Sequence, residues 1–482
     1  MIYYAIYKTE WCPRLNSKSY LFLHSLIFME TKSTTQQIAD FVTTLQYDSL
    51  SSDLLLMVKR SILDGLAVIM AGSTTQTSRL IRNYLEDTKV DGKSRVLGSS
   101  ISTSAQLAAL ANGISGHVMD YDDTQLSSLP NRVYGLLTHP TVPPLAGVLA
   151  LSQEIECTID QILIAYCIGL EVECKIAEAI NPNHYKRGFH STGTIGIFGV
   201  TVVAAKLFGL SNIQIRYALG IAASKSAGLR VNFGTMMKPY HAGAAAENGI
   251  VAAKLARLGY KADPNALDGE WGFFQVSGGG VDADLIRDKL GNPWSILEPG
   301  ISVKPYPCGS LAHPSMDAIL DLVVEFNITP DQIEEVKLGT NSNVLAALRY
   351  NEPKDELEAK FSIPFCLGIL ILDRKAGIEQ FTLERVKSPD VLDMMPKIKA
   401  YLDESIEAMG FERIRSVVEI KLKSGKTFHK EAFTSRGTPE RPMSVDELNR
   451  KFRECTSGIL TSNNIEKSIN TVWNIEKEKN LE

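Results

Sequence analysis

Several signatures of well-known protein classes are absent from this chain of 482 residues. No two of its seven cysteines have the C-x-x-C spacing of a zinc site, and their scatter through apolar segments indicates reduced thiols and a cytoplasmic protein. No apolar run is long enough to span a bilayer, so a membrane is not an expected partner. The net charge of −5 gives no reason to expect nucleic acid as a partner either.

Apolar residues recur at helical spacing from Thr34 to about Gly300, which predicts one helix after another. One such segment covers residues 55–72, where Gly72 is predicted to end the helix. Small side chains let helices approach closely, so the later segments predict a compact bundle. These small-residue segments are 105–111, 196–208 and 242–258. The glycines of residues 193–199 lack the spacing of a dinucleotide-binding loop, and close helix packing explains them better.

The helical spacing of apolar residues gives way to a mixed helix and strand pattern near Lys304. Residues 334–339 alternate like a strand, residues 361–372 form an apolar helical segment, and residues 417–430 predict a β-hairpin that turns at Ser424-Gly425. A capping box that begins at Ser444 predicts the start of a further helix.

The predicted fold is therefore mainly α with a smaller α+β domain. A large helical domain covers residues 29–300, an α+β lid domain covers residues 301–436, and the C-terminal segment 437–482 returns to the helical domain. We expect a small-molecule site in the cleft between the two modules.

The N-terminus does not follow this pattern. Residues 1–28 are aromatic-rich and aperiodic, and the apolar run 20–28 has the length of a signal-peptide core without a small-residue cleavage site after it. We interpret residues 1–28 as a non-native or disordered extension, with Met29 as the working start. A targeting segment is the alternative interpretation.

Three carboxylates and a threonine lie within five residues, from Asp120 to Thr124, and His139 follows closely. Like charges this near raise each other's pKa unless something cationic lies among them. The cluster therefore indicates a bound cation, an anionic substrate held by neighbouring bases, or the start of a helix, and a solvated turn is the plain alternative. A metal site would use Asp120, Asp122 and Asp123 with His139, but no second acidic motif supplies further ligands.

Basic residues in turn-like contexts complete the set of candidates. His139, His190, His241 and His313 stand among glycine, proline and serine residues, which are typical of loops. Proline follows both Lys238 and Lys304, which predicts an extended backbone at each lysine. Each residue alone is more often structural or solvated. Together they suit a small polycarboxylate, because lysine binds carboxylates and histidine can move a proton beside them.

Six short motifs in this order resemble those of the MmgE/PrpD family, and the resemblance covers residues 33–475. The family includes 2-methylcitrate dehydratase, cis-aconitate decarboxylase and iminodisuccinate epimerase. The motifs are residues 117–124 (HVMDYDDT), 138–140 (THP), 188–190 (GFH), 238–241 (KPYH), 304–308 (KPYPC) and 359–362 (AKFS).

The resemblance implies a helical domain, an α+β lid, a homodimer, and a cleft site without metal or organic cofactor. It places Asp120, Thr124, His139, His190 and Tyr350 at catalytic positions, and Lys238 and Lys304 at substrate-binding positions. Asp120 and Thr124 would orient the histidine that exchanges a proton, His139 or His190, or assist a departing hydroxyl.

The expected function is that of a cofactor-independent lyase acting on a citrate-like di- or tricarboxylate, with dehydration of a 2-methylcitrate-like substrate as the leading reaction. Decarboxylation or epimerisation in the same site, or a non-catalytic carboxylate-binding dimer, are the alternatives. The fourteen residues 125–138 make a longer loop than the decarboxylase branch has, which argues against decarboxylation.

Overall fold

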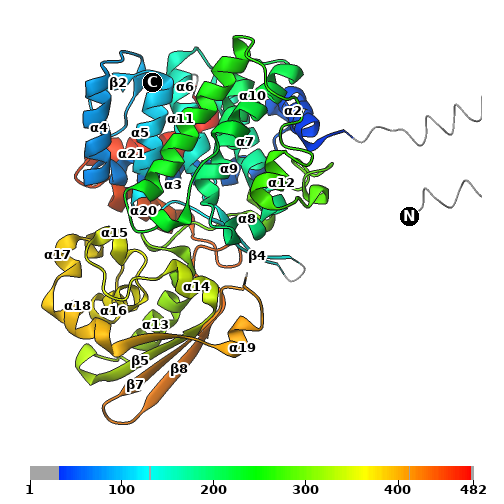
Figure 1. The fold of residues 1–482 in the computed structure, drawn as a ribbon. Helices are drawn as coiled ribbons and strands as arrows, with labels where there is room; N and C mark the ends of the chain where they lie inside the picture. Colours follow the sequence, from blue (N-terminus) through cyan, green and yellow to red (C-terminus); the bar gives the residue numbers. More distant parts are fainter. Residues whose placement is uncertain (1–31, 130–131, 412, 479–482) are drawn as a thin grey trace, which may run out of the picture. The chain divides into compact units, whose positions relative to one another are not determined.

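The computed structural model describes residues 32–129, 132–411 and 413–478, so the predicted N-terminal extension 1–28 and the start at Met29 lie outside the described residues. The architecture is mainly helical with a smaller α+β part, as predicted (Figure 1). None of the described helices is long and apolar enough to cross a bilayer.

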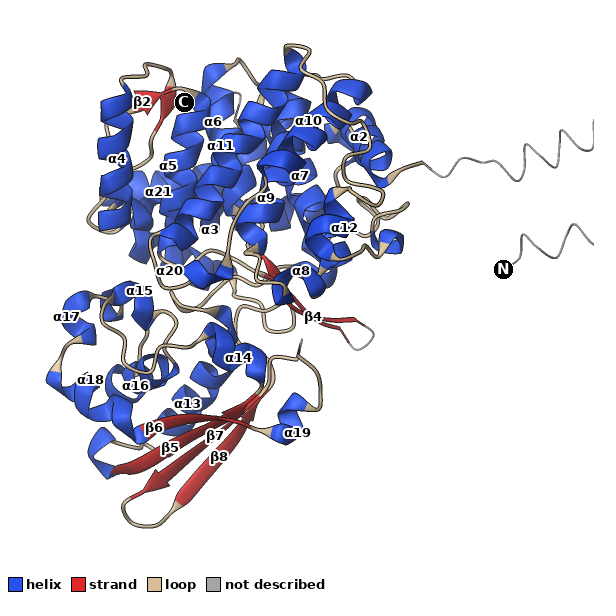
Figure 2. Cartoon of the chain, viewed as in Figure 1, coloured by secondary structure: helices blue, strands red, loops and turns tan. Residues whose placement is uncertain are grey.

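Eleven α-helices precede residue 300 in the described ranges, and helices are drawn in blue in Figure 2. They are α2 (Thr34–Thr44), α3 (Ser52–Ser73), α4 (Gln76–Thr88), α5 (Ala105–Val118), α6 (Val142–Glu154), α7 (Ile159–Ile180), α8 (Asn183–Lys186), α9 (Ser191–Leu207), α10 (Asn212–Lys225), α11 (Met237–Arg257) and α12 (Phe273–Gly278). Two small antiparallel ribbons interrupt them: β1 (Ser94–Arg95) with β2 (Ser102–Thr103), and β3 (Gln125–Leu129) with β4 (Arg132–Thr138).

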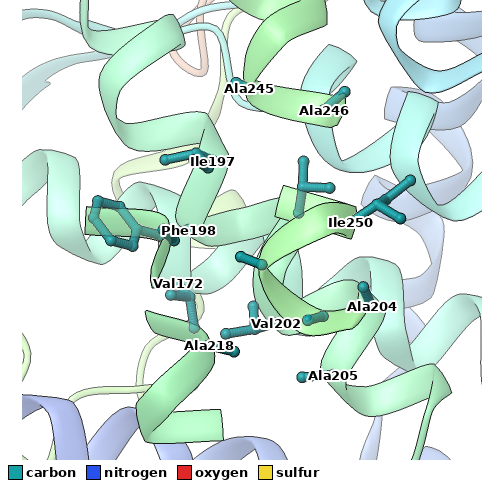
Figure 3. Packing of buried hydrophobic residues seen from close by; sticks show 14 of the residues in the cluster. Val172, Ile197, Phe198, Val202, Ala204, Ala205, Ala218, Ala245, Ala246 and Ile250 are labelled. Atoms are coloured by element: carbon teal, nitrogen blue, oxygen red, sulfur yellow. The ribbon is translucent and has the colours of Figure 1, made fainter. Parts of the chain in front are cut away.

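Small residues allow the central helices to pack closely. Residues such as Phe198 and Val202 of α9 and Ala246 and Ile250 of α11 belong to one buried apolar cluster (Figure 3). Between α5 and α11, a Cβ atom on Gly113 would lie 2.8 Å from Gly243 Cα, so the two backbones are nearly in contact. This close approach fixes α11, which carries Lys238, against α5, which ends just before Asp120.

The prediction that Gly72 ends its helix is wrong. Gly72 lies inside α3, which continues to Ser73 and has Thr74 as its C-cap. A Cβ atom at Gly72 would collide with the carbonyl group of Ser115 on α5. The glycine therefore serves close packing between α3 and α5 and does not terminate the helix.

The α+β part contains a four-stranded sheet in the order β6-β5-β7-β8, with β5 and β6 parallel and the other pairs antiparallel. The strand predicted at 334–339 and the hairpin at 417–430 are confirmed. The strands are β5 (Ile333–Thr340), β6 (Ile398–Leu402), β7 (Ser416–Leu422) and β8 (Thr427–Ala432). The helices are α13 (His313–Glu325), α14 (Ser342–Ala347), α15 (Glu356–Ala359), α16 (Ile363–Asp373), α17 (Leu383–Val386), α18 (Pro389–Met394) and α19 (Glu404–Glu407).

Two C-terminal helices follow, α20 (Val445–Thr456) and α21 (Ser462–Trp473). Ser444 forms the predicted capping box with Glu447 at the start of α20. Phe452 and Ile469 share a buried apolar cluster with Leu63 of α3, so the tail packs on the first helices of the chain. The exact domain boundaries at 300 and 436 stay a prediction.

Replacing Gly113 with alanine should lower the free energy of unfolding by about 1–3 kcal/mol, because the added methyl group forces α5 and α11 apart. Gly368 of α16 is a matched control, since a Cβ atom there would make only ordinary contacts at 3.4 Å. Gly368→Ala should be neutral or stabilising, by up to about 1 kcal/mol. Urea unfolding of both variants measures the difference, and equal stabilities would contradict the close approach of α5 and α11.

Candidate active site

Four of the predicted basic and acidic residues, Asp120, His139, Lys238 and Lys304, meet at a small cavity of about 20 Å³, which is room for roughly one water molecule. Residues of the helical part and of the α+β part line it together. From the helical part and the segment that follows it come Asp120, His139, Tyr185, Phe233, Lys238 and Lys304. From the α+β part come Gly309, Ser310, Leu311, Ala347, Leu348 and Phe361.

Asp120 lies at the centre of this group, just after α5, where a left-handed backbone (φ 50°) turns the chain back. Its Oδ1 atom accepts hydrogen bonds from Lys238 Nζ at 2.8 Å and from Lys304 Nζ at 2.9 Å. All three side chains are buried. Burial alone would raise the pKa of Asp120, but the two ammonium groups hold it well below its usual range, so the carboxylate is ionised.

The two lysines differ in the donors that they have left. Lys304 donates to Asp120 Oδ1, to the Asp120 carbonyl at 2.9 Å and to the Cys308 carbonyl at 3.1 Å, which uses all three N–H groups. Lys238 donates to Asp120 and to His117 Nε2 at 2.8 Å, which leaves one N–H group. Of these two lysines, only Lys238 can therefore donate to a ligand without giving up a bond.

A second carboxylate, Asp122, lies between two imidazoles. His117 Nδ1 is 2.8 Å from Asp122 Oδ2, and His139 Nδ1 is 3.3 Å from the same atom. Burial lowers the pKa of His117 to about 3, so it is neutral. Because an ammonium group can only donate, His117 Nε2 accepts from Lys238 and its proton is on Nδ1, facing Asp122. Both nitrogens of His117 are occupied.

His139 is the histidine that lines the cavity. Burial lowers its pKa, and Asp122 opposes this by favouring the protonated form. With Nδ1 turned toward Asp122, the remaining nitrogen, Nε2, is available to a ligand. A carboxylate behind a histidine is the arrangement that orients an imidazole for proton transfer.

His190 lies outside the regular elements, directly before α9, as predicted for a loop residue. It is the N-cap of α9, its ring stacks on His117 with centroids 5.4 Å apart, and its Nδ1 is 3.0 Å from His241 Nδ1. It is not among the described residues that line the cavity. Burial holds the pKa of His190 well below its usual range, so this ring is a neutral neighbour of the site.

Sequence reasoning placed Lys238, His241 and His313 on turns or extended backbone, and this is wrong. Lys238 and His241 lie in α11, with Pro239 accommodated in the first turn of that helix, and His313 begins α13. Proline near a helix start costs little because the first N–H groups have no partner inside the helix.

Two predicted site residues lie apart from the central group. Thr124 is buried, pairs its backbone with Ser302, and has a hydroxyl group without a partner among the described residues. Tyr350 donates its hydroxyl to the Phe233 carbonyl at 2.8 Å and is not among the described residues that line the cavity. Its contact with the site passes through Phe233, which does line it.

The long loop between Thr124 and His139 is a β-hairpin, β3–β4, that sequence reasoning did not predict. Both ends are held by buried glutamates of α7. Gln125 donates to Glu178 at 2.7 Å, and Thr138 donates to Glu173 at 2.6 Å. The first and last residues of this segment, Gln125 and Thr138, are therefore both held in place by hydrogen bonds to α7.

Lys451 of α20 supports the site from the C-terminal tail and was not singled out from sequence. Its ammonium group donates to the carbonyls of Tyr121 at 2.8 Å and Lys304 at 3.0 Å, and it pairs with Asp64 at 2.6 Å. These carbonyls belong to the residue after Asp120 and to Lys304 itself. A lone lysine in an amphipathic helix carries no sequence signal for such a role.

The side chains of His117, Asp120, Asp122 and His139 lie close enough to hold a metal ion, with ligand atoms within 4.8 Å of one another. Two ammonium groups already bond to Asp120 Oδ1, however, and one of them occupies His117 Nε2. A divalent cation there would face both charges at short range, so this set of donors suits an anion better.

Asp120→Asn should be strongly destabilising, by about 3–5 kcal/mol, because two buried ammonium groups lose their counter-charge. Asp123→Asn is the matched control. Asp123 accepts hydrogen bonds from Thr141, and burial raises its pKa to about 8, so asparagine resembles its protonated state. Urea unfolding near neutral pH should therefore separate the two variants clearly, and similar losses in both would contradict the assigned charges.

The stability of Asp123→Asn should also change with pH. The pKa of Asp123 is about 8 in the folded chain and about 4 when unfolded, so the wild-type protein loses stability as pH rises between these values. The variant lacks this loss, and its stability relative to wild type should therefore increase from about pH 5 to about pH 7.5. A constant difference between the two proteins would show that Asp123 is ionised throughout.

Comparison with known proteins agrees with the motifs. The chain is 28% identical over 460 residues to the cis-aconitate decarboxylase of Homo sapiens and 24% identical over 462 residues to that of Aspergillus terreus. These alignments cover 93% and 92% of this chain and 93% of each relative. Residues 36–286 match the MmgE/PrpD N-terminal domain and residues 306–477 match the MmgE/PrpD C-terminal domain. The chain therefore belongs to the MmgE/PrpD family.

Proposed function

We propose that this protein is a cofactor-independent lyase that decarboxylates cis-aconitate or a closely similar tricarboxylate. The observation that carries the proposal is the placement of two buried ammonium groups and the Asp122–His139 pair around one cavity. Relatives named cis-aconitate decarboxylases, aligned over more than nine-tenths of the chain, favour this reaction over the dehydration expected from the motifs.

The reaction needs positive charge and one proton. Breaking the bond between the CH₂ carbon and its carboxylate releases CO₂, and the electron pair forms a terminal C=C bond. The electrons of the original double bond then take a proton at the CH carbon. Lys238 and Lys304 would stabilise the negative charge that develops on the remaining carboxylates.

His139 is the proposed proton donor. Its Nε2 atom has no hydrogen-bond partner among the described residues, whereas both ring nitrogens of His117 have one. The charge of Asp122 together with the carboxylates of a bound substrate would raise the pKa of His139 and favour its protonated form. Asp120 would keep the two ammonium groups in position.

The long loop that argued against decarboxylation does not displace the site, because Gln125 and Thr138 fix both of its ends. The cavity, however, holds only about one water molecule, so substrate entry requires the helical and α+β parts to separate. The homodimer and the cytoplasmic location stay predictions.

Dehydration is the second candidate, and one observation favours it. His139 is neutral in the ligand-free site, and a neutral imidazole beside a carboxylate is suited to remove a proton α to a carboxylate. Incubating the protein separately with cis-aconitate, 2-methylcitrate, citrate and iminodisuccinate, with products followed by NMR, distinguishes the reactions. We expect CO₂ release from cis-aconitate, and water loss from 2-methylcitrate alone would refute the leading proposal.

His139→Gln should reduce turnover by roughly 10²–10⁴-fold, since the proton donor is lost while the side chain keeps its polarity. His429→Gln is the control, because His429 is an exposed histidine on β8. If turnover in His139→Gln equals that of the control, another group supplies the proton.

Prolonged dialysis against a chelator should leave turnover unchanged, because ammonium groups occupy the positions that a cation would need. The assay is the initial rate before and after dialysis, with added Mg²⁺ or Zn²⁺ as the restoring condition. Loss of activity that a metal restores would show that the His117–Asp122–His139 group binds a cation.

A further inference from the structure

Two residues that line the cavity carry buried hydroxyl groups without a hydrogen-bond partner among the described residues. They are Ser310 Oγ and the Tyr185 hydroxyl, on side chains whose residues are 5% and 4% exposed. A buried hydroxyl without a partner costs free energy, so such groups are rare unless a ligand or water completes them.

Ser310 comes from the α+β part and stands beside further donors. It begins a short 3₁₀ turn, Ser310–Ala312, that runs directly into α13. Within the described residues, the backbone N–H groups of Ser310 and Leu311 have no acceptor, as is usual for the first residues of a helical turn. Leu311 also lines the cavity, so up to three donors lie on this side.

Tyr185 comes from α8 on the helical side. The Arg230 guanidinium lies 3.6 Å from the centre of its ring, stacks on it, and interacts electrostatically with the Tyr185 hydroxyl without completing a hydrogen bond to it. Burial raises the pKa of the Tyr185 hydroxyl, so it remains protonated and able to donate. The hydroxyl and N–H groups of Ser310, Leu311 and Tyr185 that lack partners among the described residues can all donate a hydrogen bond. They therefore suit a ligand group that only accepts hydrogen bonds.

The charges already in the site show why such donors are needed. Lys238 and Lys304 carry two positive charges, and Asp120 and Asp122 carry two negative charges in the same buried cluster. All three donors of Lys304 are in use, and Lys238 has one left. One free ammonium donor cannot satisfy the six oxygen atoms of a tricarboxylate.

We propose that Ser310, from the α+β part, and Tyr185, from α8 of the helical part, form a subsite that binds one carboxylate of a tricarboxylate ligand. The N–H groups of Ser310 and Leu311 complete it. The subsite deepens the proposed function and rests on it for the class of ligand. It also explains how a third carboxylate is bound when most N–H donors of Lys238 and Lys304 are already used by protein acceptors.

Binding of tricarballylate, a saturated tricarboxylate that cannot lose CO₂ by this route, tests the subsite without any turnover. Isothermal titration of the full chain should show that Ser310→Ala and Tyr185→Phe each raise Kd by roughly tenfold, the loss expected for one hydrogen bond to a charged group. Ser315→Ala is the matched control. Ser315 is a buried serine of α13 that donates to the Ala312 carbonyl at 2.8 Å, and its replacement should change Kd less than twofold.

The outcomes separate the subsite from the reaction. Wild-type affinity in both Ser310→Ala and Tyr185→Phe overturns the subsite, and so does a wild-type protein that does not bind tricarballylate. If tricarballylate binds and both variants bind it weakly, the subsite stands even when cis-aconitate is not turned over, and only the proposed reaction then fails. Circular dichroism and thermal midpoints equal to wild type show that the variants are folded.

Discussion

The site depends on one buried carboxylate that holds two buried ammonium groups. Lys238 comes from α11 and Lys304 from the segment that leads into the α+β part, and neither cation has another carboxylate within ion-pairing distance among the described residues. Isolated charges at this depth would cost several kcal/mol each. Asp120 therefore joins distant segments of the chain and keeps two positive charges beside a cavity.

The environment, rather than residue type, gives neighbouring carboxylates different roles. Asp120 faces two ammonium groups and is ionised, whereas Asp123, three residues on, faces Thr141 and lies near Asp64, and its pKa rises to about 8. Asp122 lies between two imidazoles, bonded to His117 Nδ1 and 3.3 Å from His139 Nδ1. One short acidic motif thus supplies a counter-ion, a neutral hydrogen-bonding group and a partner for histidine.

Local patterns allowed much of the fold to be predicted, and long-range contacts explain what could not. The strand alternation at 417–430 and the capping box at Ser444 act within a few residues, so sequence shows them directly. The motifs also brought Asp120, His139, Lys238 and Lys304 together correctly. Local rules failed at Lys238, because Pro239 can be accommodated in a first helical turn, and at Gly72, because the approach of α5 is decided by tertiary packing.

The residues that sequence missed share one property. Lys451, Ser310 and Tyr185 matter because of what lies opposite them across the fold, and nothing in their neighbours along the chain marks them. A prediction of such residues needs the distances between segments, which only the folded chain supplies.

The contact of Lys451 has a consequence for how the protein is made. Its ammonium group fixes the backbone beside Asp120 and at Lys304, yet Lys451 lies in α20, 147 residues after Lys304. Because a ribosome delivers the chain from its N-terminus, every other charged group of the site emerges before this support does. The backbone beside Asp120 and at Lys304 therefore lacks this support until α20 itself has been synthesised.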